Sequence, residues 1–161
     1  MKVEKTYGQM VKDLTEKHWK DDLKQGTLYE VKGTVGSGKT SLALDKAFNY
    51  MLKHNRAELY LINTFLNHDG IINKLYGRLS VLSRTHLDYE SNQSFKNIGE
   101  VYELLNKLPF SVPVVVIVEN FSKKEYSYFK SVYKKYPNIS IICAEQIPQN
   151  LGIKLEVTEN K

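Results

Sequence analysis

One short glycine-rich stretch limits what this chain can fold into more than any other feature. Residues 33–40 read Gly-Thr-Val-Gly-Ser-Gly-Lys-Thr and match G-x-x-x-x-G-K-[ST], a loop whose backbone surrounds phosphate groups. Residues 27–32 alternate as in a half-buried strand, and residues 41–52 repeat apolar side chains at helical spacing. Strand, glycine-rich turn and helix are the structural context that this motif requires.

The residue types in this stretch suit phosphate and magnesium chemistry. Glycines let backbone N–H groups turn toward a phosphate without Cβ clashes, and the start of the following helix adds a partial positive charge. Lys39 can reach the β- and γ-phosphates of ATP, and the Thr40 hydroxyl can hold Mg²⁺. The residues predicted to cradle the nucleotide are Gly33, Gly36, Ser37, Gly38, Lys39, Thr40 and Ser41.

Length and composition predict one cytoplasmic domain. The chain has 161 residues, 42% of them hydrophobic, and no window of about 18 apolar residues that would cross a membrane. A net charge of +5 fits a polyanionic partner such as nucleic acid, although lysine-rich surfaces also serve solubility alone. Cys143 is the single cysteine, which excludes an intramolecular disulfide and a cysteine-based zinc site. It stands in an apolar run, and we expect it in the core.

The rest of the chain alternates strand and helix patterns. The predicted strands are residues 58–64, 114–120 and 139–144, with a short last strand at 151–157. The continuous Val/Ile run at 114–118 predicts a central, fully buried strand. The predicted helices are a short amphipathic one around residues 10–14, with Met10, Val11 and Leu14 on its apolar face, and longer ones at 71–82, 98–108 and 126–136. Residues 83–97 are turn-like with room for an edge element. This alternation predicts an α/β fold with helices on both faces of a mostly parallel sheet. We expect one domain over residues 1–161, with a helical lead-in at 1–24, a core at 25–148 and a tail at 149–161.

Polar residues follow several of these strands. Ligands bind at the carboxyl ends of strands in such sheets, so we expect Asn63 and Thr64, Glu119 and Asn120, and Glu145 and Gln146 to converge with the glycine-rich loop. Glu119 is the candidate second ligand of Mg²⁺, although aspartate is the usual residue there; the alternative is a solvent-exposed carboxylate. Gln146 could contact the γ-phosphate or a metal-bound water, or be a plain polar strand end.

Hydrolysis of the phosphate anhydride of a nucleotide needs further groups. Asp69 and Glu145 are the candidates to orient an attacking water. Arg78 and Arg84 are the candidates for an arginine that neutralises transition-state charge, with surface ion pairs as their alternative role. Lys154 could act there as a point charge.

The chain resembles the core of RecA-like ATPases, above all DnaB-type replicative helicases and the KaiC/RadA group. Residues 23–33 leading into 36–44 are similar to the opening of that core, and residues 59–64 to its second strand. Residues 114–119 resemble its Walker B strand, and residues 141–147 a strand that ends in glutamine. The run 144–148 is equally similar to FtsK/HerA-type DNA translocases. The resemblance covers roughly residues 23–148.

The resemblance implies ATP and Mg²⁺ as ligands, Lys39, Glu119 and Gln146 as catalytic residues, and Thr40 and Glu119 at the metal. It also implies single-stranded DNA or a replication protein as partner, and assembly of the chain with copies of itself. The sequence departs from the family at Thr64, where the helicases have a catalytic glutamate, and at Glu119, where they have aspartate.

Three functions follow as hypotheses. The first is a reduced or accessory ATPase of DNA replication or mobile-element maintenance. The second is a nucleotide-dependent binding or loading module with little hydrolysis, which the threonine at position 64 favours. The third, a small P-loop kinase, is weaker because such enzymes clamp two phosphorylated substrates with several arginines, and this chain has three.

Overall fold

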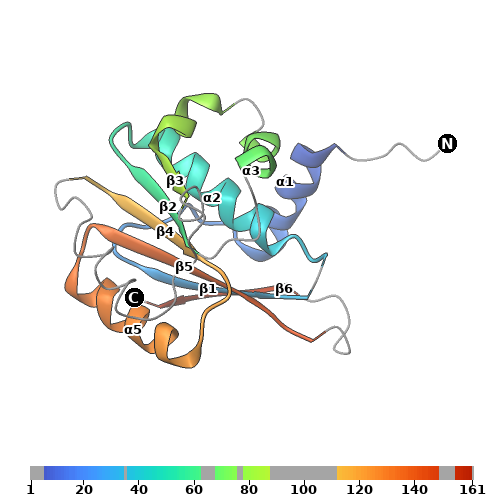
Figure 1. Ribbon diagram of the computed structural model, residues 1–161. Coiled ribbons are helices and arrows are strands. Elements are labelled where there is room, and N and C mark those ends of the chain that lie inside the picture. Colours follow the sequence, from blue (N-terminus) through green and yellow to red (C-terminus); the bar gives the residue numbers. More distant parts are fainter. Residues whose placement is uncertain are drawn as a thin grey trace.

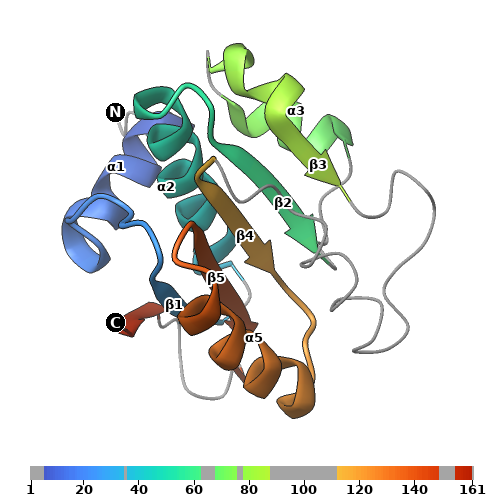
Figure 2. The same cartoon turned by 90° about the vertical axis from the view of Figure 1, so that its left-hand side faces the viewer.

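A mostly parallel sheet forms the middle layer of the chain. The computed structural model describes residues 6–34, 36–62, 68–75, 78–87, 112–148 and 155–160. Within them, six strands lie in the order β3-β2-β4-β5-β1-β6. Their bounds are β1 Leu28–Gly33, β2 Glu58–Ile62, β3 Thr85–Leu87, β4 Val114–Val118, β5 Ile139–Gln146 and β6 Leu155–Asn160. The first five run parallel, and β6 pairs antiparallel with β1 at one edge. The carboxyl ends of β2, β3 and β4 therefore point the same way (Figure 2).

Helices cover both faces of this sheet. The described helices are α1 Tyr7–His18, α2 Lys39–Lys53, α3 His68–Leu75, the 3₁₀ helix η1 Leu79–Arg84, and α5 Lys123–Lys135. Helices α1, α2 and α3 lie on one face and α5 on the other, which gives three layers (Figure 1). Helix α2 packs across β1, β5, β4 and β2. Within the described ranges, no helix is both long and apolar enough to cross a bilayer.

The side chains of the central strand β4 alternate between two cores. Val115 and Ile117 pack in the core beneath α2, whereas Val114, Val116 and Val118 pack with Phe129 of α5. All of β4 is buried, because both sheet faces are covered. The expectation of a central, fully buried strand is confirmed.

Helix α2 buries the face that its sequence predicts. Leu44, Ala47, Phe48 and Met51 are all buried beneath it, and the helix begins two residues earlier than the pattern indicated. In the lead-in, Trp19 is 5% exposed and packs against Tyr29 in a tilted arrangement, with ring centroids 4.7 Å apart.

Helix α1 differs in part from the prediction. It is longer than expected, running from Tyr7 to His18. The prediction that Met10 shares the apolar face with Val11 is wrong: Met10 is 52% exposed and Val11 is 4% exposed. Neighbouring residues in a helix point about 100° apart, and in α1 it is the Val11 side chain that turns inward while Met10 faces solvent.

The expected continuous helix over residues 71–82 is also wrong. Helix α3 ends at Leu75, and Arg78 precedes the separate 3₁₀ helix η1 instead of lying within a helix. The Arg78 N–H donates to the Leu75 carbonyl and the Val81 N–H to the Arg78 carbonyl, both with three-residue spacing. A glycine at position 77 disfavours helix by about 1 kcal/mol relative to alanine, and the apolar spacing did not reveal it.

The remaining expectations fall near the chain ends and edges. Strand β3 supplies an edge element within the turn-like stretch, and the last strand β6 is placed later than 151–157. Cys143 is buried, and this burial raises the pKa of its thiol. The helix expected at 98–108 lies outside the described residues, as do Asn63, Thr64 and Lys154.

Shortening Phe48 to alanine tests the core beneath α2. Phe48 is 0% exposed and Leu52, on the same helix, is 44% exposed. Phe48→Ala is expected to lower the free energy of unfolding by about 3–5 kcal/mol, through lost burial and a residual cavity. Leu52→Ala is the matched control and should stay within about 0.5 kcal/mol of the wild type. Urea titration followed by circular dichroism measures both, and equal losses would contradict this packing.

Candidate functional site

The glycine-rich loop between β1 and α2 has a backbone that only glycines adopt without strain. Gly36 has φ 81° and Gly38 has φ 87°, both in the left-handed region. Gly33 is required for a different reason, because a Cβ there would lie 2.3 Å from the Ser37 Oγ. The Ser37 N–H donates to the Thr34 carbonyl at 3.1 Å and closes the turn.

The loop ends at the positive end of α2. Gly38 is the N-cap residue and provides no side-chain hydrogen bond to the helix, whose first internal bond runs from the Leu42 N–H to the Gly38 carbonyl at 2.9 Å. The N–H groups of a first helical turn lack intrahelical acceptors and attract anions. Beside them, the Ser37 Oγ is buried without a hydrogen-bond partner among the described atoms. A phosphate oxygen would supply the acceptor that this hydroxyl lacks.

Glu119 lies on the α2 side of the sheet because of strand periodicity. It follows β4 and is two residues after Ile117, which packs beneath α2, so its side chain emerges on the same face. The Glu119 residue is 1% exposed, and the Thr40 Oγ1 donates to its Oε2 at 3.5 Å. The alternative of a solvent-exposed carboxylate is therefore wrong.

The approach of Thr40 to Glu119 spans an intervening strand. Strand β5 lies between β1, which leads into the loop, and β4, which leads into Glu119. Two strand spacings amount to about 9–10 Å, and α2 crosses this distance by packing over all three strands. Neighbouring ligand oxygens of an octahedral Mg²⁺ with bonds of about 2.1 Å lie about 3.0 Å apart, so the two oxygens, 3.5 Å apart, would need to approach by about 0.5 Å to share an ion.

A cavity of about 360 Å³ opens beside Lys39 at the carboxyl ends of β4 and β5. Its other lining residues are Asn120, Phe121, Ala144, Glu145 and Gln146. Asn120 has φ 50°, a left-handed conformation that asparagine tolerates better than most residues. This turn directs the chain away from the sheet directly after Glu119.

The structure brings some predicted residues into this cavity and leaves others away from it. Glu145 and Gln146 line the cavity together with Lys39. Asp69 is exposed in the first turn of α3 and is not among the described lining residues, so Glu145 is the better placed of the two carboxylates predicted to orient water.

Both candidate arginines have structural partners within the chain. Arg84 donates to the carbonyl oxygens of Met51, His54 and Ala57 at 2.8–3.1 Å and so stabilises the negative end of α2. Arg78 pairs with Asp45 of α2, with 2.6 Å between Nη1 and Oδ1. These contacts favour the ion-pair and capping roles over a transition-state role.

Two contacts at the loop were not foreseen from the sequence. A Cβ on Gly38 would lie 2.6 Å from the Leu14 Cδ1, so α1 rests directly against the loop. The Lys74 Nζ of α3 donates to the Ser41 Oγ at 2.9 Å, and burial lowers the pKa of Lys74. Neither residue stands in a recognisable motif, since both reach the loop through helix packing.

Comparisons with known proteins add no family: no protein-family model matches the sequence, and no curated protein matches it significantly.

Adding a methyl group at Gly33 tests the geometry of the loop. Gly33→Ala is expected to lower the free energy of unfolding by about 1–3 kcal/mol, because its Cβ would overlap the Ser37 Oγ. The double variant Gly33→Ala/Ser37→Ala removes that oxygen and should recover most of the loss. Thermal and urea unfolding measure both, and strictly additive losses would show that the two residues do not touch.

Proposed function

We propose that this chain is a RecA-like P-loop protein that binds ATP with Mg²⁺ and hydrolyses it. The observation that carries the proposal is the meeting of the Thr40 hydroxyl and the buried Glu119 carboxylate at 3.5 Å, at the start of the helix that bears Lys39. A hydroxyl and a carboxylate at the mouth of a phosphate-binding loop are the ligands that Mg²⁺ takes in such sites.

Each part of the site has a separate task in this proposal. The loop from Gly33 to Gly38 and the first turn of α2 hold the phosphates, with Lys39 against the β- and γ-phosphates. Thr40 and Glu119 hold the ion, which supplies charge neutralisation on the transferred phosphoryl group. Burial of a carboxylate costs free energy, and a bound ion would add to the contacts that offset the desolvation of Glu119.

The cavity beside Lys39 is where water would attack. Glu145 is the acidic residue among its described lining, and we assign it the orientation of the water. Gln146 is adjacent and can hydrogen-bond the γ-phosphate. Register supports this placement, because Gln146 pairs with Gly33 and so lies level with the start of the loop.

The charge of helix α5 favours a polyanionic partner for this protein. Its five lysines, against one glutamate, account for most of the net charge of +5 of the whole chain. These lysines are exposed, and Phe121 and Tyr126 stack at the start of the helix with ring centroids 5.8 Å apart. Because the segment 119–122 joins α5 to the site, single-stranded DNA on this helix is a partner suited to ATP-dependent action.

Replacing Lys39 or Glu119 tests nucleotide binding. Lys39→Ala is expected to weaken ATP binding about ten- to hundredfold, since a charged hydrogen bond to phosphate is lost. Glu119→Gln should weaken binding in the presence of Mg²⁺ and have little effect in EDTA. Lys32→Ala, which removes an exposed lysine of β1, is the matched control. Titration calorimetry measures all three, and binding that ignores both Mg²⁺ and Lys39 would overturn the proposal.

Replacing Glu145 separates an ATPase from a nucleotide-dependent binding module. Glu145→Gln is expected to lower steady-state ATP hydrolysis about a hundredfold or more and leave ATP affinity unchanged. Glu156→Gln, a like change at an exposed position of β6, is the control. Both are measured with and without single-stranded DNA. Tight ATP binding without turnover by the wild type under either condition would favour the binding module, as the threonine at position 64 suggests.

A further inference from the structure

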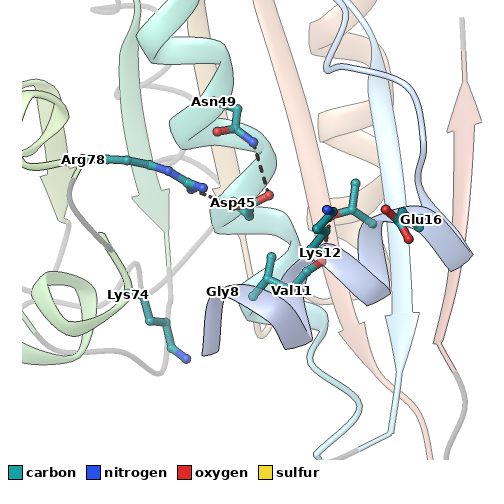
Figure 3. A pocket seen from close by; sticks show the side chains of 9 residues that line it. Gly8, Val11, Lys12, Glu16, Asp45, Asn49, Lys74 and Arg78 are labelled. Carbon is teal, nitrogen blue, oxygen red and sulfur yellow. Dashed lines mark hydrogen bonds and ion pairs between the residues drawn. The ribbon is translucent and has the colours of Figure 1, made fainter. Parts of the chain in front are cut away.

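A second cavity lies on the other side of the P-loop helix. It has a volume of about 320 Å³ and lies between α1, α2 and the segment that carries Lys74 and Arg78. Asp45 and Asn49 of α2 line its middle, between Val11 of α1 on one side and Arg78 on the other (Figure 3). Small-molecule sites enclose roughly 300–1,000 Å³ and combine apolar walls with a few fixed polar groups. This cavity has the required volume and several fixed polar groups, and among its described lining residues Val11 supplies the apolar side chain.

The cavity continues from the phosphate loop. Lys74, one of its lining residues, donates to the Ser41 Oγ, two positions after Lys39. Ser41, Asp45 and Asn49 are spaced four residues apart and therefore share one face of α2. The helical rise places Asp45 about 6 Å and Asn49 about 12 Å beyond Ser41.

Helix α1 closes the cavity on the side opposite Arg78. Its Leu14 lies against Gly38 of the loop, while Val11 and Gly8, one and two turns earlier, line the cavity. The same helix thus contacts the phosphate loop and walls the cavity. A ligand that starts in the loop and passes Ser41 would enter between α1 and α2.

The polar groups of the cavity hold one another in place. Asp45 accepts from Arg78 at 2.6 Å and from the Asn49 Nδ2 at 3.2 Å, and its side chain is 13% exposed. A guanidinium has five N–H donors, and the Asn49 amide carries an acceptor oxygen as well. Donors and an acceptor held in this way suit the edge of a nucleobase and the hydroxyls of a ribose.

We propose that this cavity receives the base and ribose of the nucleotide whose phosphates lie in the P-loop, and that Asp45, Asn49 and Arg78 select the base. The inference rests on the proposed function, since it gives a binding site to the nucleoside part of the nucleotide whose phosphates the proposed function places in the loop. Lys74 would lie where the α-phosphate meets Ser41, and a phosphate there would oppose the effect of burial on the Lys74 ammonium.

Comparing nucleotides with inorganic tripolyphosphate isolates the nucleoside contribution. Affinities of the full chain for ATP, GTP, CTP, UTP and tripolyphosphate, each with Mg²⁺, are measured by titration calorimetry. The wild type is expected to bind at least one nucleoside triphosphate about tenfold or more tightly than tripolyphosphate. Gly8→Trp places an indole in the cavity and should abolish that advantage while leaving tripolyphosphate affinity unchanged. Gly8→Ala, which also replaces the glycine of α1 but adds only a methyl group to the cavity, should retain it.

Asn49→Ala gives a second reading that does not depend on filling the cavity. It is expected to alter the ranking of the four nucleotides about fivefold or more, with tripolyphosphate again unaffected. An unchanged ranking, or equal losses for nucleotides and tripolyphosphate, would overturn the inference. Equal wild-type affinity for tripolyphosphate and all four nucleotides would overturn it and leave the proposed phosphate site standing. If neither the nucleotides nor tripolyphosphate bind the wild type, the proposed function itself is contradicted.

Discussion

The pairing of β4 with β5, and of β5 with β1, is the constraint on which the site depends. It sets β4 two strands away from the strand that enters the loop, and α2 must cross that distance for Thr40 to meet Glu119. Complete burial of β4 on both faces leaves this arrangement little freedom. A shift of one residue in register would turn Glu119 toward α5 and away from the loop.

Helix α2 links the two cavities. Its first turn follows the glycine-rich loop, its apolar side packs in the core, and its polar side carries Asp45 and Asn49. Contacts from three directions hold it: Leu14 of α1 against Gly38, Lys74 of α3 at Ser41, and Arg84 at the carbonyl groups near its far end. A helix held at both ends can keep the glycine-rich loop preorganised, which would lower the ordering cost if the loop binds an anion as proposed.

The predictions from sequence succeeded where a local period carried the information. The Val/Ile run predicted the buried strand β4, and the spacing of Leu44, Phe48 and Met51 predicted the buried face of α2. They failed where the apolar spacing outweighed other local signals. Over residues 71–82 this spacing predicted one continuous helix, although the sequence includes a glycine at position 77, which disfavours helix. The chain instead forms α3 and a separate 3₁₀ helix. Met10 was misplaced because the apolar spacing alone did not show which side of the short helix α1 turns inward.

The sequence by itself determined the glycine-rich loop, the strand before it, the helix after it, and the polar residues that end the strands, because each of these follows from neighbours within a few positions. The tertiary structure decided which strand ends become neighbours. Strand order placed Glu119 against Thr40 and Glu145 beside Lys39, and helix packing brought Leu14, Lys74 and Arg78 around α2. These contacts join residues far apart in the chain, and their geometry comes from burying two cores against one sheet, which no local pattern encodes.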